Sequence, residues 1–218
     1  MMDRLRCASR KRHPFQGLRR FGLVVVSSLL LTACSVLPQN ELAQSMRTYT
    51  IEPELPQPGG ARPLSAVIHV APISPASTLQ SNRMLYVPRR FELSAFVTSE
   101  WASEPAQLLD AWLVRALEQS GHFTKVISGP SSRSADLRLD VELLVLRQEF
   151  LQVPSSIHMV LRAVLTDLRA GQVLASRELA YVQPAPSEDA YGGVQAANQA
   201  VGKALSDLVR FSAAAGGS

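Results

Sequence analysis

Apolar and polar residues alternate along three stretches in the second half of the chain. In each stretch every second side chain is apolar, which is the spacing that turns one face of a β-strand towards a core. The stretches are 137–145, 157–165 and 173–181, and Gly171 lies in the turn between the last two. We therefore expect an antiparallel meander of three strands.

Two other stretches repeat their apolar residues with the period of an amphipathic helix. The first opens at Ser103-Glu104-Pro105, and Gly121 follows it as a helix-ending glycine. The second follows Ser187-Glu188-Asp189 and carries its apolar stripe from Val194 to Val209. Shorter β-rich runs predict further strands at 49–51, 66–70, 83–87, 91–96 and 123–127. The pattern predicts an α/β (α+β) domain, in which a mixed, largely antiparallel sheet packs with two main helices.

Four apolar residues fall on the strand faces opposite the main alternation. They are Leu144, Leu146, Val160 and Val164. Either helices and loops cover both faces of the sheet, or one apolar patch is open to a partner. We expect both faces to be covered, because monomeric proteins rarely expose large apolar patches.

The N-terminal region has the order of a secretory signal. A basic stretch ends at Arg19-Arg20, the mostly apolar segment 21–31 follows, and Leu31-Thr32-Ala33-Cys34 comes next. These four residues resemble the lipobox of bacterial lipoproteins, which implies that Cys34 is acylated, with palmitate among the acyl groups, and that the chain is cut before it. The apolar segment is too short to span a bilayer, which needs roughly 20 residues.

Removal of residues 1–33 changes the charge of the chain. The 218-residue sequence has 22 Lys and Arg against 18 Asp and Glu; seven of the former and one of the latter lie in 1–33, which leaves 15 basic and 17 acidic residues. The mature chain is therefore slightly acidic, and its charge does not favour nucleic-acid binding. We expect a signal peptide at 1–33, a lipidated tether at 34–46, one domain at 47–211 and a disordered tail at 212–218.

No constellation typical of catalysis, metal binding or cofactor binding stands out. The chain lacks a Gly-x-Ser-x-Gly elbow and a phosphate-binding glycine loop. The mature histidines, His69, His122 and His158, are too far apart in sequence for a metal pair on one helix. We expect no catalytic, cofactor-binding or metal-binding residue, so the chain is not predicted to be an enzyme.

Several polar and aromatic residues have a structural interpretation beside a functional one. Alternating carboxylates on one strand are typical of a solvated face, large aromatics of a core, and scattered arginines of a solvated surface. The competing functions are a ligand face, a ligand cage and contacts with lipid phosphates. The residues concerned are Asp136, Asp140 and Glu142, then Trp101 and Trp112, then Arg83, Arg89 and Arg90.

An ordered series of segments resembles the ABC-type transport auxiliary lipoprotein family, whose members include the PqiC-like lipoproteins. The series comprises Leu79–Tyr86, Phe91–Phe96, Ser99-Glu100-Trp101, Pro105, Leu108-Leu109, Gly121-His122-Phe123, Val126 and Ala135–Leu139. The resemblance extends over about 49–209 and accommodates the lipobox, although no single segment is diagnostic.

This resemblance implies a fold similar to the TolB N-terminal domain and a non-catalytic role beside an MCE-domain protein and an ABC permease in (phospho)lipid transport between membranes. It also implies a possible lipid ligand and a homo-oligomeric ring. We expect a Gram-negative envelope protein, anchored through Cys34 and facing the periplasm; Ser35, where Asp favours inner-membrane retention in enteric bacteria, favours the outer membrane. The alternatives are a periplasmic lipid-binding carrier, a structural envelope lipoprotein and, least favoured, a lipid hydrolase.

Overall fold

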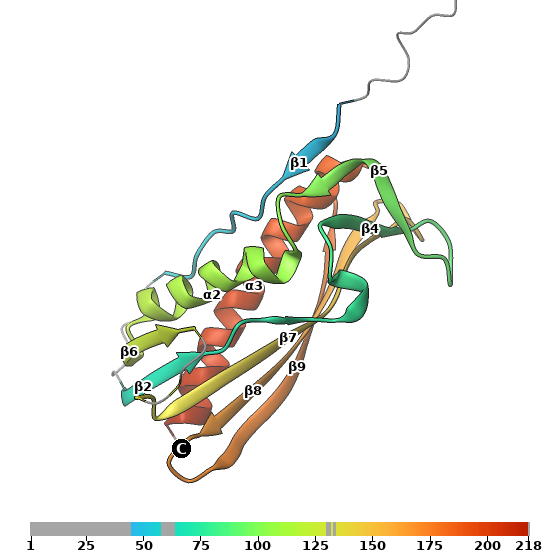
Figure 1. The fold of residues 1–218 in the computed structure, drawn as a ribbon. Helices are drawn as coiled ribbons and strands as arrows, with labels where there is room; N and C mark the ends of the chain where they lie inside the picture. The colour runs from blue at the N-terminus through green and yellow to red at the C-terminus, as the bar shows by residue number, and fades with distance from the viewer. Residues whose placement is uncertain (1–44, 58–63, 130–131, 133, 218) are drawn as a thin grey trace, which may run out of the picture. The chain divides into compact units, whose positions relative to one another are not determined.

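The computed structural model describes residues 45–57, 64–129, 132 and 134–217. Among these residues, nine strands form one sheet and two α-helices pack against it (Figure 1). In chain order the elements are β1 (Arg47–Tyr49), β2 (Leu64–Val70), β3 (Ser74–Pro75), the 3-10 turn η1 (Ser77–Leu79), β4 (Arg83–Val87), β5 (Ser94–Trp101), α2 (Pro105–Ser120), β6 (Phe123–Ser128), β7 (Leu137–Glu149), β8 (Ser156–Asp167), β9 (Gln172–Pro184) and α3 (Ala190–Gly216).

Strand β7 organises the sheet. Along one edge it pairs with β8, which pairs with β9, and both pairings are antiparallel. Along its other edge β7 pairs in parallel with β2, β3 and β4 at successive positions. Strands β5 and β1 extend the sheet beyond β4, and β6 extends it beyond β2. The predicted meander is confirmed, and the sheet is mixed as expected; β4 and β5 also pair in an antiparallel manner.

Both helices cover the same face of the sheet (Figure 1). Gly121 ends α2 with a left-handed φ of 65°, and Asp189 caps α3 by accepting a bond from the Gly192 N–H at 2.8 Å. The helices bury their apolar stripes on the alternating apolar residues of the strands. Side chains at most 1% exposed in this core include Leu113, Leu117, Leu139, Leu143, Met159, Leu165, Val201 and Leu205. The predicted fold class is confirmed.

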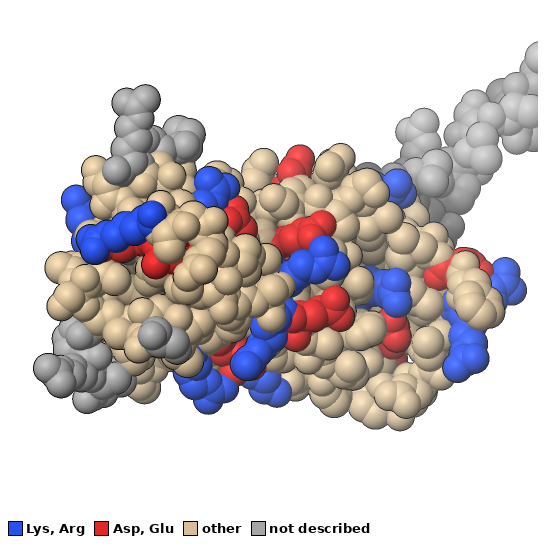
Figure 2. Space-filling view, turned by 90° about the horizontal axis from the view of Figure 1, so that it is seen from below, with Lys and Arg blue, Asp and Glu red and all other residues tan. Residues whose placement is uncertain are grey.

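The opposite face of the meander is lined by charged side chains. Asp140 and Glu142 are each about 40% exposed there, in ion pairs with neighbouring arginines. Figure 2 shows acidic and basic side chains interspersed over the side of the molecule that it presents. The expectation that both faces are covered is therefore wrong for this region. Val160 is 9% exposed and Leu144 and Val164 are half-buried, so they leave little apolar surface open.

A β-bulge at Leu144 changes which side chains of β7 face the helices. The pairing passes from Leu143 opposite Leu161 to Val145 opposite Val160, so Leu144 is an extra residue. After the bulge, Leu146 and Gln148 point into the core and are 3% and 1% exposed. Strict alternation predicts that Leu146 lies on the outer face. The extra residue reverses the alternation, so Leu146 lies in the core instead.

Several element boundaries differ from the sequence-based expectation. The first strand ends at Tyr49, and Ile51 is buried beyond it. The N-cap of α2 is Glu104 rather than Ser103. The residues 212–216, expected in a disordered tail, form the last turn of α3. Ser212 is fully buried there and its hydroxyl donates to the Leu208 carbonyl at 2.8 Å, so packing holds a segment that composition alone describes as low-complexity.

Candidate functional site

The predicted lipidation residue, Cys34, lies outside the described residues, as do the signal peptide and most of the tether. The acylation of Cys34 therefore stays a prediction. Within the described part of the chain, neither helix combines the length and the apolar character needed to cross a bilayer.

The three mature histidines lie on separate elements. His69 on β2 is 1% exposed, and its Nε2 is 2.7 Å from the Gly129 carbonyl oxygen, whereas its Nδ1 has no partner among the described residues. His158 on β8 is 3.2 Å from Glu149 Oε1, and His122 lies between α2 and β6. In the described ranges, no three His, Cys, Asp or Glu side chains converge as metal ligands.

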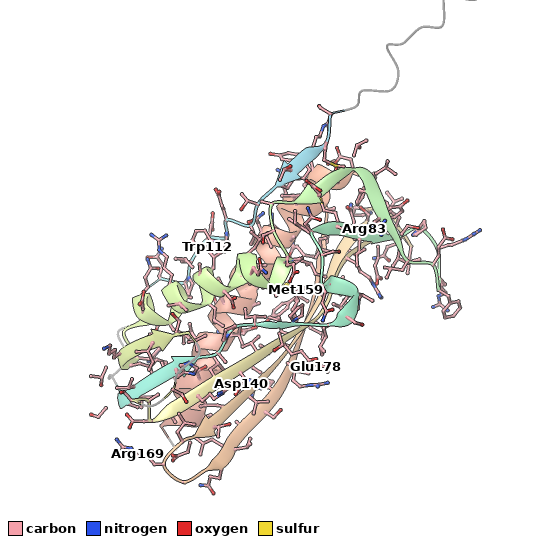
Figure 3. The ribbon with its side chains drawn as sticks, viewed as in Figure 1. Arg83, Trp112, Asp140, Met159, Arg169 and Glu178 are labelled. Carbon is pink, nitrogen blue, oxygen red and sulfur yellow. The ribbon has the colours of Figure 1, made fainter. Side chains whose placement is uncertain are left out.

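The carboxylates of β7 belong to ion pairs on the open face of the sheet. Asp140 pairs with Arg138 at 2.7 Å, and Glu142 with Arg162 at 3.1 Å. Asp140, labelled in Figure 3, alternates along β7 with the buried Leu139 and Val141, so it belongs to the face away from the core. Pairs as exposed as these contribute little to stability and bring no proton acceptor into a sheltered site. The arrangement is that of a solvated face.

Asp136 and Glu149 have pKa values below the ordinary range for different reasons. The Asp136 carboxylate accepts the Val67 N–H at 2.8 Å, which lowers its pKa, and Arg169 adds to this effect. Burial opposes the ionisation of Glu149, but its contacts with Arg147 and His158 together outweigh burial and lower its pKa. Both carboxylates therefore stay ionised, so neither has the raised pKa of a general acid.

Both tryptophans pack against the fold. Trp101, at the end of β5, is 3% exposed in the core. Trp112 on α2 donates its Nε1–H to the Ile51 carbonyl at 2.7 Å, and the Arg115 guanidinium lies 5.6 Å from its ring centre. Trp112 thus ties the segment after β1 to α2 rather than forming a ligand cage.

A groove of about 770 Å³ runs between residues 52–56 and α3. Tyr191, Val194 and Gly202 contribute its less polar part, whereas Asn198 and Lys203 contribute polar groups. The Asn198 amide oxygen also accepts the Glu52 N–H at 2.6 Å, which holds the two walls together. The groove is open and mixed in character, unlike the mostly apolar concave sites that enclose small ligands.

One end of the sheet carries an exposed apolar surface that the sequence did not predict. Strands β4 and β7 run parallel and pair at Tyr86 with Gln148 and at Val87 with Glu149, so the loops that follow them emerge side by side. These loops and the start of β5 expose large apolar side chains. We call this set the apolar tip: Phe91, Leu93, Val97, Leu151 and Val153.

The base of the apolar tip is an aromatic cluster. The rings of Tyr86 and Phe96 lie 4.7 Å apart, and Phe150 lies 5.8 and 6.4 Å from them. The sequence predicted a strand at 91–96, which places Phe91 inside it. In the structure, β5 begins only at Ser94, and Phe91 has a left-handed φ of 68° that leaves its side chain in solvent. The signal available in the sequence was apolar residues near two prolines, Pro88 directly after β4 and Pro154 shortly before β8.

The arginines of the hairpin are surface residues. Arg83 begins β4, and Arg89 pairs with Glu92 in the hairpin loop. Arg90 is exposed beside Phe91 and forms no ion pair with any residue in the described ranges. The structure therefore brings two of the three arginines, Arg89 and Arg90, to the apolar tip.

Comparison with known proteins places the chain in a family. A family model described as ABC-type transport auxiliary lipoprotein component matches residues 49–209. The crystal structure of protein XCC0632 from Xanthomonas campestris is 25% identical, with a TM-score of 0.70, and the match covers 78% of this chain and 96% of that one.

A second crystal structure, of an uncharacterized protein, is 17% identical with a TM-score of 0.61 and is matched over 76% of this chain and 97% of its own; it supports the fold alone. No curated protein sequence matches the chain. The family model spans most of the chain, and it confirms the resemblance carried by the ordered segments between 79 and 139. The chain belongs to the ABC-type transport auxiliary lipoprotein component family.

Proposed function

We propose that this protein is a non-catalytic, lipid-anchored accessory component of an MCE-type ABC system that moves phospholipids between membranes. The observation that carries the proposal is the family match over residues 49–209, which follows a sequence of signal type ending at Cys34. The site geometry is compatible with this role, because the polar groups of the sheet are engaged in structural ion pairs.

The anchor is the first part to test. Two acyl chains hold a protein on a membrane stably, whereas one chain binds at only about 10⁴ M⁻¹. We expect Cys34→Ala to move the protein from the outer-membrane fraction to the soluble periplasmic fraction or to leave it unprocessed. Mass spectrometry of the peptide that begins at residue 34 measures acylation directly. Outer-membrane retention of Cys34→Ala at the wild-type level contradicts the anchor.

The transport partners require a separate experiment. Crosslinking of native membranes followed by mass spectrometry should recover an ABC permease and an MCE-domain protein with this chain. The Cys34→Ala protein is the matched control, since it keeps the sequence of the domain but lacks the acyl group that is proposed to anchor it. Recovery of peptidoglycan-bound proteins in place of these partners would favour the structural envelope role.

A periplasmic lipid carrier is the second candidate function. The observation in its favour is the groove between residues 52–56 and α3, whose volume of about 770 Å³ lies within the range of ligand sites. Native mass spectrometry of the protein extracted without added lipid decides between the two. A stoichiometric phospholipid that is lost in Gly202→Leu would support the carrier.

The family resemblance also motivates a homo-oligomeric ring. Strand β9 is the outer strand of the meander and has one paired edge among the described residues, so a second chain has a backbone edge to contact. Mass photometry of the lipidated protein in detergent tests this part of the proposal. A single peak at the monomer mass across concentrations contradicts it.

A further inference from the structure

The apolar tip exposes large apolar side chains that make no contribution to the buried core. Phe91, Val97 and Val153 have exposures of 102%, 84% and 88%, the highest among the large apolar side chains that the structure describes. Of the nine exposed large apolar residues in the described ranges, five belong to the apolar tip. Exposed apolar side chains that gather in one place typically mark a surface that binds a partner or a membrane.

The backbone of the apolar tip is held in a defined shape. Phe91 is the only described residue other than glycine with a positive φ, a conformation that a bulky side chain rarely adopts. The neighbouring loop is fixed to β4 by a bond from the Phe150 N–H to the Val87 carbonyl at 2.9 Å. Its far end is fixed to the start of α3, because Glu188 accepts the Ser155 N–H at 2.8 Å. Phe91 thus holds a strained backbone conformation without burying its own side chain, which is typical of a functional site.

The charge around the apolar tip favours a lipid surface. Arg89 and Arg90 precede Phe91 directly, and Arg90 has no acidic partner among the described residues. A protruding aromatic residue with adjacent basic residues matches the two layers of a bilayer surface, since the ring enters the acyl boundary while the guanidinium meets phosphates. A soluble protein partner could also bind the apolar residues, but it would not require the basic residues Arg89 and Arg90 beside them.

The direction of β1 also favours a lipid bilayer as the partner of the apolar tip. Strand β1 runs parallel to β5, with Arg47 opposite Ser99, so the start of β1 is directed towards the end of β5 that bears the apolar tip. Ten residues lie between Cys34 and Ser45, and the eleven Cα–Cα steps reach at most about 40 Å. From Ser99, opposite Arg47, to Ser94 at the apolar-tip end of β5, the strand spans roughly 17 Å, which is less than this reach. A lipid on Cys34 and the apolar tip can therefore meet one membrane together.

We propose that the apolar tip inserts into the interface of a phospholipid bilayer, where Phe91 and Val153 enter the acyl boundary and Arg90 contacts lipid phosphates. That the tip meets the same membrane as the lipid anchor rests on the proposed function, whereas its affinity for a bilayer does not. The tip thus orients the domain on the membrane, which a lipid anchor alone does not do.

The test places an environment-sensitive fluorophore on the apolar tip. The full chain is purified in its lipidated form and reconstituted in vesicles of phosphatidylethanolamine and phosphatidylglycerol. With residues 1–33 removed and Cys34 acylated, Phe91→Cys supplies the single free thiol for an NBD label. We expect the emission to shift to the blue, to rise about threefold and to be quenched by lipids that carry a nitroxide in the acyl chain.

Ala170→Cys is the matched control. It lies in the exposed β8–β9 turn, where Figure 3 labels Arg169 at the opposite end of the sheet from Arg83. The twelve steps of β7 separate the two ends by about 40 Å, so a label at 170 should stay in water on the same vesicles. Val153→Cys provides a second reporter on the other loop, should Phe91→Cys fail to fold.

Each alternative gives a different result. Labels at 91 and 153 that stay in water on vesicles overturn the proposal. If the labels are shielded from water only at high protein concentration, and the particle mass grows, the apolar tip binds a second copy of the chain. If they are shielded only when the chain is crosslinked to a transport protein, the apolar tip binds that partner. Both results overturn the proposal. If Cys34 carries no lipid, the anchor fails, but the unlipidated chain mixed with vesicles still tests the apolar tip.

Discussion

At the scale of single residues, the contact between Gly193 and Gln148 joins α3 to the sheet. Gln148 is 1% exposed, and its amide nitrogen donates to the Ser155 hydroxyl at 2.9 Å. Gly193 lies directly against the Gln148 amide oxygen, where a methyl group on residue 193 would overlap that atom. Glycine is therefore required here for close approach of the helix rather than for backbone freedom.

We expect Gly193→Ala to destabilise the protein in spite of the higher helix propensity of alanine. Overpacking of this kind costs about 1–3 kcal/mol, whereas the propensity gain is about 1 kcal/mol. Thermal unfolding followed by circular dichroism measures the change. Gln148→Ala removes the overlapping atom, so Gly193→Ala should cost less, or even stabilise, in that background. An equal loss in both backgrounds would show that the Gln148 contact is not the cause.

At the scale of elements, the C-terminal end of α3 is part of the core. Phe211 is 5% exposed, and the Cα of Gly216 lies so close to Leu137 that a side chain there would push against it. The alanine-rich composition of 213–215 predicts a frayed end, but a helix is stabilised mainly by what its apolar face contacts. These contacts come from β7 and β2, which no local pattern near residue 215 reveals.

Removal of residues 212–218 should therefore lower stability. The truncation deletes the buried Ser212 and exposes apolar surface at the start of β7. We expect a loss of about 1–3 kcal/mol, which corresponds to a decrease in Tm of several degrees for a domain of this size. Urea unfolding of the truncated chain, compared with a chain lacking Ser218 alone, measures the loss. Coincident unfolding curves would support the disordered tail that the composition predicts.

At the scale of the whole molecule, acid tolerance depends on carboxylates with lowered pKa values. Asp189 accepts hydrogen bonds from the Ser187 hydroxyl and the Gly192 N–H, which lower its pKa, and Asp136 accepts the Val67 N–H with the same effect. A carboxylate with a folded pKa below its unfolded value stabilises the fold above the unfolded pKa. Its contribution is lost as the pH falls through the folded pKa.

We expect the Tm to be nearly constant from pH 7 to 5 and to fall as the pH drops below about 4. The double variant Asp136→Asn and Asp189→Asn retains an oxygen acceptor at both sites but no longer binds a proton there. Its Tm should be lower than that of the wild type at pH 7 and should fall less steeply towards pH 3. Calorimetric scans across this range test the prediction, and parallel pH profiles for the two proteins would contradict it.

The family, the fold class and most elements follow from the sequence, because local spacing is enough to specify them. The alternation in 137–145, 157–165 and 173–181 and the two apolar stripes depend only on neighbours along the chain. The predicted lipid site at Cys34 is likewise a local signal. The tertiary structure decided what depends on contacts between distant segments.

The bulge at Leu144, which turns Leu146 and Gln148 into the core, depends on the register with β8. The apolar tip depends on β4 and β7 ending side by side, although Val87 and Glu149 are 62 positions apart in the chain. A run of apolar residues in a sequence predicts burial, since most such residues are buried. Only the packed chain decides which of them, such as Phe91, have no partner within the fold and remain for a surface outside it.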